Sequence, residues 1–464
     1  MHTYLERLDE NRLLLHPGAV PGMRVPGMIY ADAYVESLLA EENALLQVAR
    51  VATLPGILGY SFGMPDIHWG YGFPIGGVAA FDAEEGIISP GGVGYDISCG
   101  VRLLASRIPA KEGKKMMPRL VRALFEAAPS GAIPGGGKKL SLRELEKVLQ
   151  KGAPWAVEEG LGTPEDLKRI EEGGSLKGAL PSAISERAKE RGKAQLGTLG
   201  SGNHFLEIQE VAEIFDSSEA AKMGIEPGCL TVMIHCGSRG LGHQICDDSI
   251  KIMRRSMGKW NISVPDPQLC CVPLQSKEGQ EYLGAMRGAA NYAMTNRQII
   301  AARVRRVFQS FFPKEPLQTV WDVSHNLAHM EKHSWKGQER TLCVHRKGAT
   351  RAFEGEPVLI PGSMGTSSYV LVGTKRGEEE TFGSTCHGAG RSMSRSRALK
   401  ETGKENLSGQ LRKRGIEVVT ASPRTLGEEA PRAYKKISSV VEVVHRGGIS
   451  LKIARLQPLG VMKG

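Results

Sequence analysis

The stretch Ser89-Pro-Gly-Gly-Val-Gly-Tyr-Asp-Ile-Ser-Cys-Gly100 leads directly into the short apolar run Val101–Ser106. A glycine-rich turn that meets such a run is typical of the end of a β-strand. Glycine lets the backbone turn tightly and approach a ligand closely, while the strand holds neighbouring side chains in place. Asp96 and Cys99 lie in this turn, so they are candidates for a functional site.

Four histidines stand in the same kind of position, beside a short apolar run and a polar or glycine-rich turn. They are His204 in Gly200–Glu207, His235 after Leu230–Ile234, His325 in Trp321–His329, and His387 in Ser384–Arg391. Taken singly, each is more often a hydrogen-bonded structural residue, and Cys99 alone would be a small buried apolar side chain. Together, carboxylate, thiolate and imidazole suit Mn²⁺, Zn²⁺ or Fe²⁺.

Composition places the chain among globular proteins. Of its 464 residues, 41% are hydrophobic and 24% charged, and glycine is enriched at 57 residues. The net charge of +10 fits either a groove for a polyanion or an ordinary solvated surface. No stretch reaches the roughly 18 apolar residues of a membrane span, and the N-terminus has no signal-peptide pattern. We therefore expect a cytoplasmic protein without a membrane partner.

The pattern along the chain predicts an α+β fold. We expect helices around Ala31–Val51, strands at Gly76–Phe81 and Val101–Ser106, and short strands with glycine loops over 317–464. Residues 110–195 read as an inserted helical segment, with helices at Ser141–Gly152 and Thr163–Gly173 and a break at Pro129–Gly137. A strand at Leu230–His235 and a long helix over 276–312 complete the prediction. One large mixed catalytic body over residues 1–464, with the 110–195 insertion, explains this order better than three separate domains.

Cysteine and histidine spacing excludes some metal sites. The eight cysteines include no CxxC pair, which argues against a disulfide framework or a zinc ribbon. His325, His329 and His333 recur every four residues and would share one face if a helix runs there. Asn326 stands where the HExxH motif needs glutamate, so a zinc protease is not expected. For His329 and His333 an ordinary polar helix face is the favoured interpretation.

Glycine-rich loops beside basic residues indicate phosphate chemistry. There is no Walker motif, since Gly131–Lys139 has the wrong spacing. Backbone N–H groups of the loops Gly237–Gly242, Pro361–Ser368 and Gly388–Gly390 can instead form anion-binding nests. The basic residues near these loops are Arg239, Arg346, Lys347, Arg351, Arg391, Arg395 and Arg397.

Taken in order, the motifs of this chain resemble those of the RtcB family of GTP-dependent RNA ligases. The matching segments are Leu54–Ile57, Met64–His68, Ser89–Leu103, Gly200–Glu207, Ile234–Gln244, Asp322–Asn326, His345–Phe353, Ile360–Ser368, Thr385–Arg391 and the penultimate Lys463. The resemblance implies an RtcB-like α+β body. It also implies a ligase that joins RNA 3′-phosphate or 2′,3′-cyclic phosphate ends to 5′-hydroxyl ends, in tRNA splicing or RNA repair.

The resemblance further implies a site for two Mn²⁺ ions and GTP. Asp96, Cys99 and His204 would bind one ion, and Cys99, His235 and His325 the other. His387 would be the nucleophile that becomes guanylylated. The residues implied in nucleotide binding are Asn203, Glu207, Asn326, Ser363, Ser368, Gly388, Ala389, Gly390, Arg391, Tyr434 and Lys463. Of these, Tyr434 would stack on the base and Lys463 would reach its edge.

RNA is the implied macromolecular partner, including broken ends and tRNA halves, and the need for an activating helper protein stays open. For RNA or phosphate contacts the candidates are Arg239, Arg346, Lys347, Arg351 and Arg397. Two other functions remain to be weighed. A metal-dependent phosphoesterase that only opens cyclic phosphates would not need His387, Tyr434 and Lys463, and a non-catalytic RNA-binding subunit would keep its function without His387.

Overall fold

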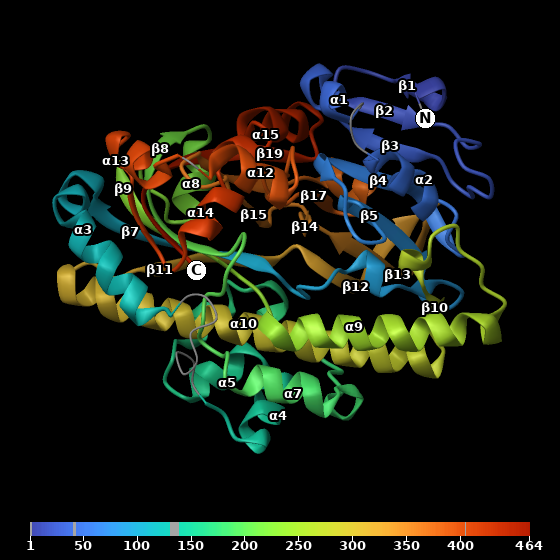
Figure 1. The fold of residues 1–464 in the computed structure, drawn as a ribbon, viewed down its shortest axis with the longest axis horizontal. Helices are drawn as coiled ribbons and strands as arrows, with labels where there is room; N and C mark the ends of the chain where they lie inside the picture. The colour runs from blue at the N-terminus through green and yellow to red at the C-terminus, as the bar shows by residue number, and fades with distance from the viewer. Residues whose placement is uncertain (1, 40–42, 130–138, 404) are drawn as a thin grey trace.

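The structure is a computed structural model, and it describes residues 2–39, 43–129, 139–403 and 405–464. Most of its strands form two large sheets that lie beside each other, with long helices beneath both (Figure 1). The predicted α+β fold class is confirmed.

The first sheet has seven strands and contains most of the N-terminal part of the chain. In spatial order the strands are β1 (Leu5–Arg7), β2 (Arg12–Leu15), β3 (Gly27–Tyr30), β4 (Ile57–His68), β5 (Ile75–Asp82), β13 (Gln338–Lys347) and β12 (Asn326–Trp335). The helices α1 (Ala33–Leu39), α2 (Ala44–Val51) and α15 (Ile437–Arg446) bury their apolar faces in one core cluster with this sheet.

The second sheet has eight strands. Seven follow one path: β11 (Gln318–Ser324), β7 (Gly100–Pro109), β9 (Cys229–Cys236), β8 (Phe205–Ile214), β19 (Ser450–Lys463), β16 (Ser368–Gly373) and β15 (Pro357–Ile360). The eighth, β18 (Glu417–Thr420), pairs in parallel with β19. Two short pairs complete the strands, β6 (Ile87–Ile88) with β10 (Val272–Pro273) and β14 (Ala349–Arg351) with β17 (Ser384–Cys386).

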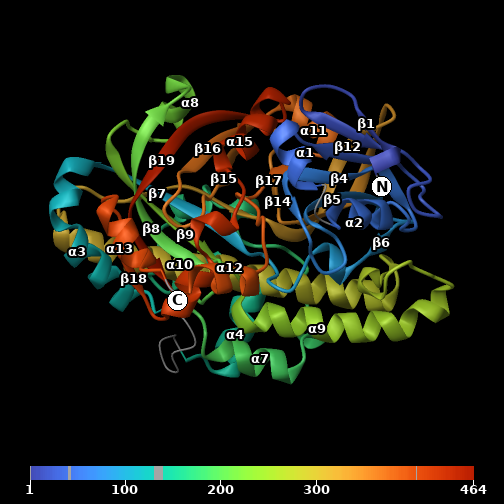
Figure 2. The ribbon, with the colours of Figure 1, turned by 45° about the horizontal axis from the view of Figure 1, so that its top comes forward.

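A long helix, α10 (Lys277–Phe311), runs beneath the sheets and supports both (Figure 1). Its first turn is capped by Ser276, whose hydroxyl accepts a hydrogen bond from the Gly279 N–H at 3.1 Å. Helix α9 (Arg239–Ser256) packs along α10, and a second view shows the same pairing (Figure 2). The long helix predicted over 276–312 is confirmed.

The helical segment 110–195 packs against α10 and α9. It contains α3 (Ala110–Ala127), α4 (Leu142–Lys151), α5 (Ala153–Glu158), α6 (Pro164–Leu167) and α7 (Glu186–Lys193). Helices α3, α4 and α5 contact α10, and α7 contacts α9. The predicted helix at Ser141–Gly152 is confirmed and begins with a capping box between Ser141 and Glu144. That this segment is an insertion into one catalytic body stays a prediction.

Two expectations about local structure were wrong or incomplete, and a third is not tested. Thr163–Gly173 is not one helix: only α6 and a 3₁₀ turn at Glu171–Gly174 form there. The first 30 residues contain β1 to β3, which the sequence did not indicate. The expected break at Pro129–Gly137 and the spacing of Gly131–Lys139 lie almost entirely outside the described residues.

The C-terminal part also differs from the expected run of short strands and loops. Besides α15 it contains four helices within the described residues: α11 (Lys375–Thr381), α12 (Arg395–Thr402), α13 (Leu407–Lys413) and α14 (Pro423–Glu428). Strand β19 is 14 residues long and ends at Lys463. One further short helix, α8 (Ser217–Lys222), follows β8.

The junction between the two sheets is where the chain brings distant segments together. Strand β11 ends at Ser324 in the eight-stranded sheet, and β12 begins at Asn326 in the seven-stranded sheet. His325 therefore lies where the chain passes from one sheet to the other. Its N–H donates to the Cys99 carbonyl at 2.8 Å, and its own carbonyl accepts from the Ala349 N–H at 3.1 Å.

Candidate metal centre and nucleotide pocket

Strand pairing explains why Cys99, His204 and His235 meet. Cys99 directly precedes β7, and His204 directly precedes β8. His235 lies in β9 between these two strands, where it faces Val101 on one side and Phe205 on the other. Cys99 is separated in sequence from His204 by 105 positions and from His235 by 136 positions. The three side chains are neighbours because the three antiparallel strands are in register.

The five proposed metal ligands form two overlapping groups. In one, the ligand atoms of Asp96, Cys99 and His204 lie within 4.8 Å of one another, and in the other those of Cys99, His235 and His325 do. The Cys99 Sγ lies 3.4 Å from His204 Nε2 and 3.3 Å from His235 Nε2. Cys99 belongs to both groups, so one thiolate could bridge two ions.

The electrostatics of these groups fit a divalent cation. Burial raises the pKa of Cys99 to about 12, and the neighbouring Asp96 carboxylate adds to this effect. Burial likewise lowers the pKa of His235 and His325 well below the ordinary value, so both imidazoles stay neutral. Asp96 Oδ1 and His235 Nδ1 are buried without a hydrogen-bond partner among the described residues. The neutral imidazoles of His235 and His325, the Asp96 carboxylate and a buried thiol that needs a nearby positive charge to ionise are suitable donors.

A buried arginine holds the backbone on which the ligands stand. Arg297 of α10 is fully buried, and its Nη1 donates to the carbonyls of Ser98 at 2.8 Å and Cys236 at 3.0 Å. Ser98 is next to Cys99 in the chain, and Cys236 is next to His235. The Arg297 Nε donates to Asp322 Oδ1 at 2.9 Å, and Asp322 also accepts from Arg102 at 2.7 Å. Arg297 therefore ties the long helix to the strands that carry the ligands.

Replacing Arg297 with methionine is expected to destabilise the protein strongly. The substitution leaves two buried carbonyls without a donor and removes one of the two cations beside Asp322, so the free energy of unfolding should fall by about 3–5 kcal/mol. Denaturant unfolding measures this change. Arg255→Met, at an exposed position of α9, is the matched control and should change stability by about 0.5 kcal/mol or less. Equal stability of the two variants would contradict the supporting role of Arg297.

His387 lies beside the metal-ligand groups and is oriented by Asp66. It follows β17 directly, and its ring centroid lies 4.8 Å from that of His325. Asp66 Oδ2, from β4, accepts from the His387 backbone N–H at 2.9 Å and bonds to the ring Nδ1. An Nδ1–H that donates to this carboxylate leaves the Nε2 lone pair free. Asp66 was not singled out from sequence as a site residue.

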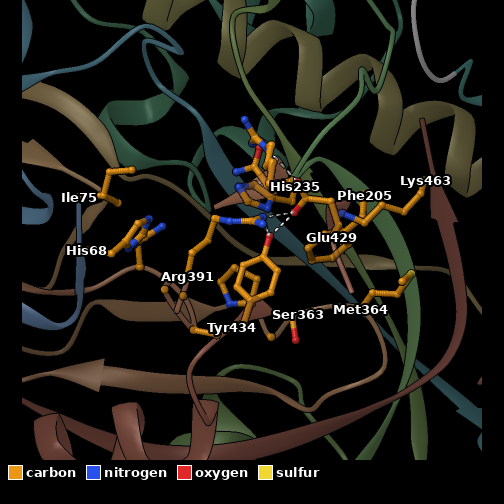
Figure 3. Close-up of a pocket in the computed structure, with 18 residues that line it drawn as sticks. His68, Ile75, Phe205, His235, Ser363, Met364, Arg391, Glu429, Tyr434 and Lys463 are labelled. Carbon is orange, nitrogen blue, oxygen red and sulfur yellow. Dashed lines mark hydrogen bonds and ion pairs between the residues drawn. The ribbon is translucent and has the colours of Figure 1, made fainter. Parts of the chain in front are cut away.

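A pocket opens next to His387. The residues that line it include Asn203, Phe205, His235, Ser363, Met364, His387, Gly388, Ala389, Gly390, Arg391, Glu429, Tyr434 and Lys463. His235 is thus shared between the pocket and the metal-ligand groups, and the two form one continuous site. In Figure 3 Arg391, Glu429 and Tyr434 point toward one another, and the Lys463 side chain extends toward them from the right beside Phe205.

Glu429 is the centre of the polar contacts in this pocket. It is buried and bonds to the Tyr434 hydroxyl, to Arg391 at 3.3 Å and to Arg395 at 3.1 Å. Burial alone would raise the pKa of Glu429, but the cations of Lys463, Arg395 and Arg391 outweigh it and hold the pKa below its ordinary value. Arg391 also lies over the Tyr434 ring at 5.0 Å. Tyr434 is therefore fixed at its hydroxyl end and by the cation.

Comparison with known proteins agrees with this arrangement. A family model described as "tRNA-splicing ligase RtcB" matches residues 47–464. The chain belongs to the RtcB family. A protein named "tRNA-splicing ligase RtcB" from Archaeoglobus fulgidus is 51% identical, with 100% of both chains covered. One of the same name from Thermococcus kodakarensis is 48% identical, with 99% of both covered. "RNA-splicing ligase RtcB" from Mycobacterium tuberculosis is 50% identical over 90% of this chain and 100% of its own length.

Three residues expected to bind nucleotide by resemblance to the RtcB family do not line the pocket directly. Glu207 and Ser368 are buried behind its wall and are joined through Gln209, whose Nε2 donates to them at 2.7 and 3.0 Å. Asn326 donates to the Asp96 carbonyl at 3.1 Å and accepts from the Gly348 N–H at 2.8 Å. Burial raises the pKa of Glu207 to about 8. A direct role of these residues in nucleotide binding stays a prediction.

Three of the expected RNA contacts are buried instead of exposed. Arg346 pairs with Glu331 at 2.6 Å, Lys347 donates to the Phe73 carbonyl at 3.0 Å, and Arg351 pairs with Glu356 at 2.9 Å. All three are at most 6% exposed. Arg346 and Arg351 pair with carboxylates, whereas Lys347 is bonded to backbone carbonyls and burial lowers its pKa to about 7. The burial of all three argues against direct contacts with RNA, and such a role stays a prediction.

The other two candidates differ from these three. Arg239 lies at the start of α9 and donates to the Thr198 hydroxyl at 3.2 Å. Burial alone would raise the pKa of Asp96, but the charges of His204 and Arg239 lower it. Arg239 thus lies close to the metal-ligand groups, as a phosphate contact would require. Arg397 is exposed on α12.

The spacing of His325, His329 and His333 has a different cause from the one expected. His329 and His333 lie on β12, not on a helix. Positions four apart also share one face of a strand, so the spacing does not distinguish the two structures. His329 pairs with Glu171 at 2.9 Å and His333 with Glu331 at 3.0 Å. Both are buried on a strand, so the polar helix face expected for them was wrong.

Besides Asp66, which does not itself line the pocket, several lining residues were not named as site residues from sequence. His68, Phe205, Pro361, Gly362 and Met364 stand inside quoted segments, Ile75 and Glu429 stand outside them, and Arg395 was noted only as a flanking charge. His68 stands in the quoted segment Met64–His68, so the motif itself held a signal. Glu429 stands in no glycine-rich turn and gave none.

Each of the eight cysteines is free and buried. Among the described residues, no helix is long and apolar enough to cross a membrane.

Proposed function

We propose that this protein is a GTP- and Mn²⁺-dependent RNA ligase. It joins RNA 3′-phosphate or 2′,3′-cyclic phosphate ends to 5′-hydroxyl ends, such as those of tRNA halves or broken transcripts. The main support is the single continuous site in which His387 lies between the two metal-ligand groups and a pocket that contains Tyr434 and Lys463. Family membership supports the same conclusion.

In the first step His387 attacks GTP. Asp66 holds Nδ1, so Nε2 is the nitrogen that forms a bond to the α-phosphorus while the bond to the departing pyrophosphate breaks. Two divalent cations, when bound by Asp96, Cys99, His204, His235 and His325, supply Lewis-acid charge neutralisation of the triphosphate. The product is a His387–GMP phosphoramidate. Arg391 and Gly388–Gly390 line the same pocket as His387 and would contact the phosphate oxygens.

The next two steps transfer the nucleotide and join the strands. An oxygen of the RNA 3′-phosphate attacks the phosphorus of His387–GMP, and the imidazole leaves, which gives an RNA-3′-pp-5′-G end. The 5′-hydroxyl of the second strand then attacks the RNA phosphorus, GMP leaves, and a 3′,5′-phosphodiester forms. A 2′,3′-cyclic end must first be hydrolysed to the 3′-phosphate. Tyr434, fixed by Glu429 and Arg391, offers its ring for stacking on guanine.

Incubation with α-labelled GTP and Mn²⁺ tests this function. The proposal predicts a covalent protein–GMP adduct that is labile in acid, and labelled RNA joined only when one end is a 3′- or cyclic phosphate and the other a 5′-hydroxyl. A phosphoesterase that lacks ligation would open cyclic phosphates without forming an adduct. Absence of the adduct with GTP and Mn²⁺ would therefore exclude the ligase and leave the phosphoesterase.

A further inference from the structure

Trp69 is exposed in a way that the fold does not require. All five tryptophans lie in the described part of the chain, and Trp69 alone is exposed, at 47%. It follows β4 immediately and precedes the turn into β5. An indole that stays exposed beside an active site offers a flat surface on which a base can stack.

Trp69 lines a groove that is continuous with the nucleotide pocket. The groove has a volume of about 420 Å³ and is lined by His68, Trp69, Ile75, Arg391, Ser392, Met393, Ser394 and Arg395. Of these, His68, Ile75, Arg391 and Arg395 also line the pocket that contains His387. One wall is therefore the end of β4, and the opposite wall is the segment that follows His387.

The groove combines a flat aromatic surface with positive charge. The Arg395 side chain is 54% exposed, and only its Nε is engaged by Glu429 at 3.1 Å. Two serine hydroxyls add hydrogen-bonding groups, and no carboxylate is among the lining residues. An aromatic ring beside arginines is how proteins commonly bind single-stranded nucleic acid, with the base stacked and the phosphate paired.

We infer that this groove binds the terminal nucleotide of an RNA strand, with its base stacked on Trp69. The inference rests on the proposed ligase function and goes beyond it by assigning an RNA subsite. Charge complementarity favours RNA over a protein segment, because no carboxylate lines the groove and Arg395, although its Nε pairs with the buried Glu429, is 54% exposed. Both RNA ends share this chemistry, so the experiment must distinguish the strand that carries the 3′-phosphate from the strand that carries the 5′-hydroxyl.

The test compares Trp69→Ala and Trp69→Phe with the wild type in two separate steps. The first step is formation of RNA-3′-pp-5′-G without a 5′-hydroxyl strand, and the second is joining of preformed RNA-3′-pp-5′-G to a 5′-hydroxyl strand. Loss of one stacked base predicts that the KM for RNA rises about tenfold or more in Trp69→Ala, while kcat at saturating RNA changes less. Trp69→Phe should restore most of the affinity. A raised KM for the 3′-phosphate strand in the first step assigns the groove to that strand. A raised KM for the 5′-hydroxyl strand in the second step assigns it to the other.

An abasic terminal nucleotide provides an independent measurement. With the wild type, the abasic strand should have a KM raised as much as the intact strand has with Trp69→Ala. With Trp69→Ala the abasic strand should show little further increase, because the base and the Trp69 ring form the same stacking contact. Phe215→Ala is the matched control, since Phe215 is an aromatic residue 41% exposed outside the groove, and it should leave the KM unchanged. Thermal unfolding establishes that each variant is folded.

An unchanged KM for both strands in a folded Trp69→Ala variant would overturn the inference. An effect of Trp69→Ala that depends on an added protein partner, and not on the RNA base, would overturn it too. If instead the wild type forms no protein–GMP adduct, the proposed function itself fails. The two failures are therefore distinguishable.

Discussion

Replacing His387 with alanine is expected to abolish formation of the protein–GMP adduct, and with it all joining of RNA ends. His387 supplies the atom that bonds to phosphorus, and no other side chain described at the site has both a free imidazole nitrogen at the pocket and an orienting carboxylate. The loss should be at least about 10³-fold, as for other nucleophile deletions. Gel detection of label from α-labelled GTP measures it.

His16→Ala is a suitable control for this experiment. His16 is an exposed histidine that pairs with Glu6 at 2.6 Å and lines no part of the site. It should form the adduct at the wild-type rate. An adduct that persists in a folded His387→Ala variant would show that another residue is the nucleophile.

Replacing Cys99 with alanine is expected to disrupt both metal sites at once. Cys99 is the one residue common to the two described ligand groups, with its Sγ 3.3–3.4 Å from imidazole nitrogens of each. The bound manganese should fall from about two ions per chain toward zero, and joining activity should fall by at least about 10²-fold. Elemental analysis of the dialysed protein and the joining assay measure these two quantities.

Cys229→Ala serves as the matched control, because Cys229 lies at the opposite end of β9 and belongs to neither group. It should keep both ions. If the Cys99→Ala variant binds as much manganese as the wild type, the thiolate is not a ligand, and the two groups must be assigned differently.

Most of the candidate site residues could be found from sequence because they stand at or near a strand end with a local signal. Cys99 and His204 directly precede strands, and His387 directly follows one. That they meet could not be derived in this way. It depends on the register of β7, β9 and β8 and on the passage of the chain between sheets at His325, both of which are long-range features.

The errors have equally specific causes. Arg346, Lys347 and Arg351 look like a basic surface cluster in the sequence. Their partners are Glu331 on β12, Phe73 between β4 and β5, and Glu356 between β14 and β15, and no local sequence pattern pairs them. The histidine spacing from His325 to His333 satisfies both strand and helix. Asp66 stands in the quoted segment Met64–His68, but its role depends on contact with His387, 321 residues further on, so the segment alone did not assign it that role.

Anomalous diffraction from crystals that contain Mn²⁺ tests the shared metal centre most directly. We expect two manganese peaks per chain, one on either side of the Cys99 sulfur. One peak should be bound also by Asp96 and His204, and the other by His235 and His325. A single peak, or peaks that do not contact Cys99, would contradict this expectation.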